Sequence, residues 1–285
     1  MTISHPSFSL AVGGVGFQVH LPNDAWLAAL APLYSEFPLD CEPEWQVTVS
    51  HDPDLMSALP SWVEHDGPLT RFHIASFAGW VDLERHQALV RTTTLEKGAS
   101  AVERGVGYAC MHTLLRRRQS LMLHAAGILW QEQGLVVSGH SGAGKTTMAR
   151  LALGYGEPFN DEVVIVDLAG YRPLLLSTPF LAPGTPPELR QRVRRIVPAT
   201  ALLLLAHAPD FQLTPMEPAE AVMELLRTNI TAVERFSSAE IWLDMVQRLI
   251  QSMPVYRLRF RPTVELWGFL ADALKNASAV ELCAS

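Results

Sequence analysis

The chain has 285 residues, of which 48% are hydrophobic, so it can bury a substantial core in one large or two small domains. Its formal net charge of −7 argues against a nucleic-acid-binding surface, because such surfaces are normally basic. Three widely spaced cysteines, the lack of a signal-peptide pattern and the lack of a long apolar run predict a cytoplasmic protein without disulfides, a zinc site or a membrane span.

The first hundred residues alternate apolar and polar side chains, which is typical of β-strands. The expected elements are a hairpin over residues 8–21, a helix over 25–34 with Asp24 as its N-cap, strands over 45–49, 71–78, 79–83 and 88–94, and a loop over 53–68. These patterns predict a small, mostly antiparallel sheet that carries one helix and no catalytic constellation. We place this β-rich region over residues 1–96.

A helix is expected over residues 97–119, where apolar side chains recur on one stripe and arginines occupy the end. We place the join between two domains near this helix. The following segment, residues 121–130, reads LMLHAAGILW and is apolar enough to be one buried strand. His124 lies within it, and is either a satisfied core histidine or a functional residue beside the loop described next.

Residues 134–146 carry the strongest motif of the chain. A short apolar run over 134–138 predicts a buried strand, and GHSGAGKT over 139–146 matches G-x-x-x-x-G-K-[ST] at every fixed position. Good helix formers follow as far as Leu153, before Gly154. Strand, glycine-rich loop and helix form the context in which this motif binds phosphate. The alternative is a glycine-rich turn with an exposed lysine.

The chemistry of such a loop comes from its backbone and from two side chains. Successive N–H groups form an anion-binding nest, and the positive end of the helix dipole adds to it. Lys145 is expected on the β- and γ-phosphates, and the Thr146 hydroxyl is expected to bind Mg²⁺. The expected nucleotide contacts are Gly139, Ser141, Gly142, Ala143, Gly144, Lys145, Thr146 and Thr147.

Acidic residues follow the loop at a distance that leaves room for one helix and a return to a neighbouring strand. Asp161 and Glu162 precede the apolar run 163–166, and they can supply a Mg²⁺ ligand or a base for an incoming nucleophile. Asp167 is a rival for the metal-binding acid, because a hydrophobic run that ends in Asp resembles a conventional Walker B motif. The alternative is that Asp161 and Glu162 are solvated turn acids.

The C-terminal part mixes apolar strands, amphipathic helices and a basic cluster at residues 190–195. This cluster is either a solvated helix face, or a lid that brings an arginine to a phosphoryl group or docks an acidic partner. The expected elements are a buried strand over 199–207, helices over 215–228, 238–253 and 264–274, with Ser238 as a cap, and an edge-like strand over 254–260.

The stretch from Leu121 to Asp167, LHAAGILWQEQGLVVSGHSGAGKTTMARLAL followed by FNDEVVIV, resembles the catalytic domain of HPr kinase/phosphorylase and its related kinases. The similarity is looser at Thr178-Pro179 and over residues 254–260. It implies an α/β (α+β) fold over residues 97–285, namely a P-loop kinase domain of the HPr kinase/PEP carboxykinase-like type with a mixed sheet. The small β-rich region of residues 1–96 resembles that of the related kinases.

The resemblance also implies roles for individual residues. The family's strand histidine corresponds to His124, and its Asp-Asp pair corresponds to Asn160-Asp161, where Asp161 acts as the general base. With Lys145, these make Asp161, His124 and Lys145 the expected catalytic residues. Asn160 departs from the family pattern, although Glu162 adds an acid directly after the pair, so the expected Mg²⁺ ligands are Thr146, Asp161 and Glu162, in an arrangement that can differ from the family's.

These residues together predict a kinase that uses ATP and Mg²⁺ and transfers the γ-phosphoryl group to a serine of a protein or peptide. The resemblance also allows a homo-oligomer. One alternative is a kinase of a small hydroxylated metabolite, which needs a closed pocket in place of a groove. Another is a nucleotide-sensing regulatory module without transfer activity, in which Asn160 marks loss of the metal site. A conventional motor or switch ATPase is disfavoured, because antiparallel patterns surround the motif.

Overall fold

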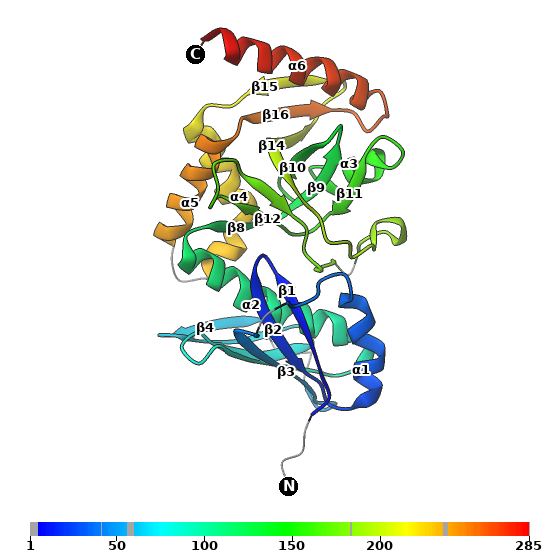
Figure 1. Cartoon of the computed structure of the whole chain (residues 1–285), viewed down its shortest axis with the longest axis vertical. Helices are drawn as coiled ribbons and strands as arrows, with labels where there is room; N and C mark the ends of the chain where they lie inside the picture. The colour runs from blue at the N-terminus through cyan, green and yellow to red at the C-terminus, as the bar shows by residue number, and fades with distance from the viewer. Residues whose placement is uncertain (1–4, 41, 56–59, 183, 236–238, 285) are drawn as a thin grey trace.

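The computed structural model describes residues 5–40, 42–55, 60–182, 184–235 and 239–284, with side chains outside 230–235 and 278–284. The chain is a mixed α/β protein with two mixed sheets. Figure 1 shows the N-terminal sheet at one end of the long axis, the second sheet above it, and the long helix α2 (Gly98–Arg117) between them.

Seven strands of the described N-terminal part form one twisted sheet in the order β1-β2-β3-β7-β6-β5-β4. Neighbouring strands are antiparallel except for the pairs β2/β3 and β3/β7. This confirms the predicted hairpin and the mostly antiparallel sheet. The strands are β1 (Ser7–Val12), β2 (Val15–His20), β3 (Trp45–His51), β4 (Trp62–Asp66), β5 (Leu69–Ile74), β6 (Phe77–Asp82) and β7 (Gln87–Thr92).

Two local expectations for this region need correction. Helix α1 (Asp24–Leu30) is capped by Asn23, whose side chain accepts the Trp26 backbone N–H, and not by Asp24; the chain then tightens into the 3₁₀-helix η1 (Ala31–Tyr34) at Pro32. Strand β4 lies inside the segment predicted as a loop. Its side chains are largely exposed because β4 is an edge strand, so it has no apolar alternation to reveal it.

Helix α2 packs against the N-terminal sheet and also touches the second layer. Its buried stripe, which includes Val102, Val106, Cys110 and Leu114, belongs to the core beneath β2, β3 and β7. This confirms the helical stripe expected from the sequence. Helix α2 thus completes the N-terminal core. The domain boundary expected between residues 96 and 97 stays a prediction.

The second sheet contains the described strands from β8 onward, in the order β11-β9-β10-β14-β13-β12-β8, with β16 beside β14 and β15 beside β16. The long strand β14 runs parallel to β10 and to β16, while its first residues pair antiparallel with β13. The strands are β8 (Ser120–Leu123), β9 (Ala125–Trp130), β10 (Gln133–Ser138), β11 (Glu157–Asn160), β12 (Val164–Asp167), β13 (Leu174–Leu176), β14 (Ile196–His207), β15 (Gln212–Pro215) and β16 (Val255–Phe260).

The segment expected as a single strand over residues 121–130 is two strands that separate at His124. β8 pairs with β12, whereas β9 pairs with β10 and β11, so the chain changes partners at this residue. Continuous burial on both sides hides the break from the sequence pattern. The strand over 254–260 is also not an edge strand, because β16 lies between β14 and β15.

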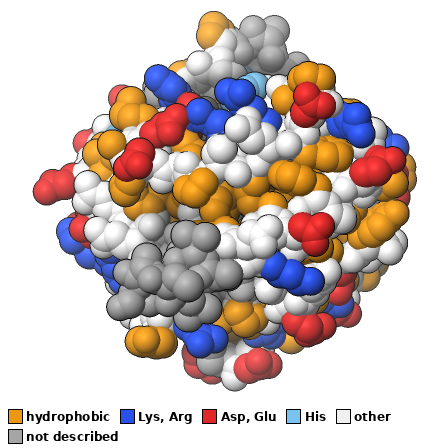
Figure 2. All heavy atoms as spheres, turned by 90° about the horizontal axis from the view of Figure 1, so that it is seen from above, with side chains coloured by type: hydrophobic (Ala, Val, Ile, Leu, Met, Phe, Trp, Pro, Cys, Tyr) orange, Lys and Arg blue, Asp and Glu red, His pale blue; other side chains and the backbone are white. Residues whose placement is uncertain are grey.

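Helices cover the second sheet on both faces (Figure 1). They are α3 (Lys145–Ala152), α4 (Pro218–Arg235), α5 (Ala239–Ser252) and α6 (Leu266–Ala284). Ser238, the expected cap of α5, lies outside the described residues. Figure 2 looks onto the end of the molecule that carries α6 and shows apolar side chains gathered between charged ones. None of the helices in the described ranges is long and apolar enough to cross a bilayer.

Candidate active site

The glycine loop, residues 139–144, joins the end of β10 to the first turn of α3. Gly142 and Gly144 have φ angles of +79° and +105°, which a side chain disfavours. A Cβ on Gly144 would also lie 2.9 Å from the Phe260 ring, so both space and backbone conformation require glycine there. His207, which the sequence did not single out, donates from Nε2 to the Gly142 carbonyl over 2.8 Å and holds the loop from its outer side.

Lys145 is folded back over the entrance of the glycine loop. Its side chain is buried, and Nζ donates to the carbonyl oxygens of Gly139 at 2.7 Å and of His140 at 3.4 Å. Burial lowers the pKa of Lys145, while the nearby Glu162 carboxylate acts in the opposite direction. The ammonium group is therefore held by uncharged carbonyl oxygens, which an anion can replace.

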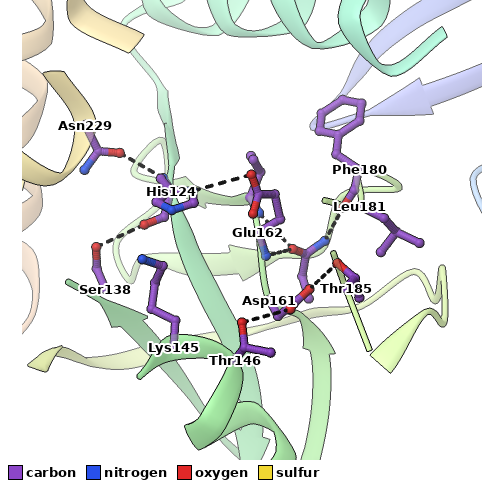
Figure 3. A network of polar contacts seen from close by, with 12 residues as sticks. His124, Ser138, Lys145, Thr146, Asp161, Glu162, Phe180, Leu181, Thr185 and Asn229 are labelled. Atoms are coloured by element: carbon purple, nitrogen blue, oxygen red, sulfur yellow. Dashed lines mark hydrogen bonds and ion pairs between the residues drawn. The ribbon is translucent and has the colours of Figure 1, made fainter. Parts of the chain in front are cut away.

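Asp161 joins the end of β11 to the start of α3. One carboxylate oxygen accepts from the Thr146 hydroxyl at 3.3 Å, and the other accepts from the Thr185 hydroxyl at 3.2 Å (Figure 3). Asp161 is buried, and burial raises its pKa, whereas the two hydroxyl donors lower it. The contact brings the predicted acid directly to the threonine of the glycine loop.

Asn160 is a structural anchor for the chain that carries Asp161. Its Oδ1 accepts the backbone N–H groups of Glu162 and Val163, each at 2.8 Å. Its Nδ2 donates to the carbonyl oxygens of Thr178 at 3.0 Å and of Phe180 at 3.2 Å. A carboxylate at this buried position would keep the first pair of bonds and lose the second, because it has no N–H to donate. The need for both an acceptor and a donor thus explains why asparagine, and not aspartate, occupies position 160.

Glu162 and His124 face each other, and the pair lies above Lys145 in the view of Figure 3. His124 Nδ1 lies 3.7 Å from Glu162 Oε1. Burial first, and the charge of Lys145 second, lower the pKa of His124 to about 4, and burial raises the pKa of Glu162. Near neutral pH the imidazole is therefore uncharged, so this contact between His124 and Glu162 is polar and not an ion pair.

Two further residues fix the strand break that carries His124. The Asn229 side-chain oxygen accepts the His124 backbone N–H over 2.8 Å, and the Ser138 hydroxyl donates to the His124 carbonyl over 3.1 Å. Both partners are buried. Sequence reasoning missed Asn229, which comes from α4. The signal available in the sequence was an asparagine in line with the apolar positions of an amphipathic helix.

The described surface has a cavity of about 340 Å³ at this place. Its walls include His124, Lys145, Asp161 and Glu162, all expected from the sequence, together with Ser141, Gly142, Gly144, Thr146 and Thr147. Two of the expected nucleotide contacts lie outside these walls. The Ala143 side chain packs in the core and its N–H donates to the His140 carbonyl, and Gly139 lies deeper, where its carbonyl receives Lys145.

The rival acid and the basic cluster lie elsewhere. Asp167 is at the opposite end of β12 from Glu162, where it accepts from the Ser120 hydroxyl and the Ala169 N–H. Residues 190–195 form no helix, so they are not a helix face. Arg192 pairs with Glu103 at 2.8 Å and Arg195 pairs with Glu157 at 2.7 Å, so these two arginines brace the fold.

Among solved structures, the chain has a distant likeness to a kinase/phosphatase. The chain is similar to the HPr(Ser) kinase/phosphatase from Coxiella burnetii, with 11% identity and a TM-score of 0.31, over 56% of this chain and 97% of that chain. No family model and no curated protein sequence matches the chain. A likeness this low does not assign the chain to that family.

The donor set of the cavity suits a hard cation beside an anion. Mg²⁺ prefers oxygen ligands and is usually bound by one or two carboxylates plus phosphate oxygens and water. Asp161, Glu162 and the Thr146 hydroxyl supply such oxygens beside the ammonium of Lys145. Among the described residues, no three His, Cys, Asp or Glu side chains gather into a protein-only metal site. The residues present therefore fit a Mg²⁺ that arrives with a phosphate ligand.

Proposed function

We propose that this protein is an ATP-dependent kinase that transfers the γ-phosphoryl group to a serine hydroxyl of a protein or peptide. The observation that carries the proposal is the contact between Thr146, in the first turn of α3, and Asp161, which directly follows β11, in one cavity with Lys145. The sequence resemblance over residues 121–167 supports the same reaction class. Phosphoryl transfer depends mainly on positioning and charge neutralisation, which these few residues can provide.

The glycine loop and Lys145 would hold the nucleotide. The β- and γ-phosphates would replace the carbonyl oxygens that now accept from the Lys145 ammonium, because a charged acceptor makes the stronger hydrogen bond. Thr146, Asp161 and Glu162 would hold Mg²⁺, and the ion would neutralise charge on the phosphates. The N-terminus of α3, with its free N–H groups, points to the same place.

Asp161 would act as the general base. The acceptor oxygen forms a bond to the γ-phosphorus, the bond from that phosphorus to the β,γ-bridging oxygen breaks, ADP leaves, and the hydroxyl proton passes to the Asp161 carboxylate. Burial raises the pKa of this carboxyl, which makes it a better proton acceptor when ionised. The hydroxyls of Thr146 and Thr185 orient its two oxygens.

His124 would face Glu162 as an uncharged polar group, 3.7 Å away. The lowered pKa of the imidazole keeps it neutral at the pH of the cytoplasm, so it adds no positive charge beside Lys145. Glu162 offsets the lysine charge when the site is empty of nucleotide, since its charge raises the pKa of Lys145.

The test is transfer from γ-labelled Mg·ATP to serine-containing peptides by purified protein, with nucleotide binding measured in parallel. Lys145→Ala should lose both nucleotide binding and transfer. Asp161→Asn should keep most nucleotide binding and lose transfer by a factor of about 10² to 10⁴, the usual contribution of a general base.

The matched control is Arg150→Ala, which removes an exposed cation from the far part of α3, where Arg150 pairs with Glu188. This variant should retain both activities. Substantial transfer by Asp161→Asn would refute the base assignment. Tight ATP binding by the wild type without transfer to peptide, protein or metabolite would favour the nucleotide-sensing alternative, and transfer to metabolites alone would favour a metabolite kinase.

A further inference from the structure

A second cavity, of about 260 Å³, adjoins the first and shares Glu162 with it. It lies between the two layers of the molecule, where β6 and α2 face the segment that follows Thr178. The walls are mainly apolar and include Phe77, Tyr108, Met111 and Phe180, with Arg104 as the cation. The N-terminal region therefore supplies part of a pocket next to the candidate active site.

Arg104 is the polar group of this pocket that is left unsatisfied. Its guanidinium lies over the Phe77 ring, 4.6 Å from the ring centre, and its Nε is buried without a hydrogen-bond partner in the described structure. Within the described residues, none of the ion pairs involves Arg104. An arginine held over an aromatic ring, with a guanidinium nitrogen that no protein group accepts from, is a good receptor for a carboxylate.

The neighbouring acid does not compete for this role. Glu103 accepts from Arg192 at 2.8 Å and from the Leu181 N–H at 3.3 Å, so its oxygens are engaged by two other groups. Burial raises the pKa of Glu103 to about 7 although Arg192 opposes the shift. Glu103 therefore fixes the wall around Leu181, and Arg104 remains the group that faces a ligand.

We propose that this cavity binds the segment of a polypeptide that carries the acceptor serine. An apolar side chain close to that serine packs among Phe77, Tyr108 and Phe180, and an acidic side chain of the same segment binds Arg104. The acceptor serine then passes Glu162 to reach Asp161. This inference rests on the proposed kinase function and names its substrate class. Apolar and acidic groups at different distances from one hydroxyl are what successive residues of a peptide provide.

The test is an array of immobilised serine peptides in which each flanking residue is varied. Binding of fluorescently labelled full-length protein is measured with a non-hydrolysable Mg·ATP analogue, and transfer is measured separately with γ-labelled ATP. The wild type should prefer an apolar residue near the serine together with an acidic one, by about tenfold over peptides in which the acid is replaced by its amide, as for a desolvated charge pair.

Variants of Arg104 decide whether this residue sets the preference. Arg104→Glu should reverse the preference from acidic to basic peptides, and Arg104→Gln, which disturbs packing less, should abolish the acidic preference. Arg194→Glu makes the same charge change at an exposed position outside the cavity and should leave the preference unchanged. Melting curves establish that each variant folds.

The outcomes separate this inference from the kinase proposal. Absence of a combined apolar and acidic preference in the wild type, or a preference that Arg104→Glu and Arg104→Gln leave intact, overturns the inference. Transfer to small hydroxylated metabolites without selective peptide binding overturns it as well. Selective peptide binding that depends on Arg104, without any transfer, supports the binding pocket and refutes the kinase function instead.

Discussion

The side-chain oxygen of Asn229 accepts the backbone N–H of His124 over 2.8 Å, although 105 positions separate the two residues. This bond ties α4 to the point where β8 ends and β9 begins. The Asn229 amide group is itself held, because Nδ2 donates to the Leu225 carbonyl at 2.9 Å. The position of the imidazole in the candidate active site therefore depends on a helix that is remote in sequence.

Asn229→Ala should destabilise the protein by about 1–3 kcal/mol, since the His124 N–H is left without its acceptor in a buried place. Transfer should fall more than nucleotide binding, because the displaced imidazole no longer faces Glu162. Urea denaturation and the transfer assay check both effects. Arg227→Ala, on the exposed side of the same helix, should change stability by less than about 0.5 kcal/mol. Equal stability of the two variants would contradict the anchoring role.

Asn160→Asp should lower both the stability of the protein and phosphoryl transfer. This variant introduces the first acid of the Asp-Asp pair found in the family that the sequence resembles. The new carboxylate would face the carbonyl oxygens of Thr178 and Phe180, where the present amide donates two hydrogen bonds. We expect a loss of about 2–4 kcal/mol at pH 7, from a buried charge without donors on that side. The loss should shrink as the pH falls and the carboxyl is protonated. Denaturation at pH 5 and pH 7 checks this, and a fully stable variant at pH 7 would refute it.

Gly144→Ala should destabilise the protein by about 1–3 kcal/mol and abolish nucleotide binding, because φ is +105° and the new methyl group would lie 2.9 Å from Phe260. A second substitution, Phe260→Leu, should relieve the clash but not the backbone strain, and so restore only part of the stability. Gly268→Ala is the matched control within α6, where no atom lies near the added methyl, and it should stabilise by about 0.5–1 kcal/mol. Denaturation measures the predicted changes in stability, and ATP-binding measurements test the predicted loss of nucleotide binding.

Asp161→Asn should make the protein more stable than the wild type at neutral pH, although it removes transfer. Burial raises the pKa of Asp161 above its ordinary value of 3.8, so the folded state binds the proton more tightly than the unfolded state does. The wild type consequently loses stability as the pH rises from about 4 through the raised pKa, whereas the asparagine variant does not. The difference in unfolding free energy should grow over that range and then level off. A difference independent of pH would contradict this account.

His124 should stay uncharged throughout the pH range in which the protein works. Its pKa is lowered to about 4 by burial and by Lys145, so an NMR titration of the imidazole should show no protonation above about pH 5. The resonance is assigned by its loss in His124→Gln. In the Lys145→Ala variant the midpoint should rise, because one of the two causes of the shift is removed. A midpoint near 6.5 in the wild type would refute the neutral role.

Local features of this protein were predictable from the sequence because they depend on neighbours along the chain. The glycine loop places Lys145 and Thr146 at the first turn of α3, and the apolar stripe of α2 follows from its spacing. The separation of Asp161 from the loop permitted one helix and a return strand, and in the structure this acid accepts a hydrogen bond from Thr146.

Strand pairing and packing decided the rest, since they join segments that are far apart in the chain. The break at His124 exists because β8 and β9 pair with different strands, and continuous apolar residues carry no sign of that change. The anchoring roles of Asn229 and Asn160 require partners that only the folded chain supplies. Likewise, the pocket around Arg104 forms only where the N-terminal region meets the second sheet. The candidate site residues could be named from the sequence, whereas their surroundings arise from tertiary contacts.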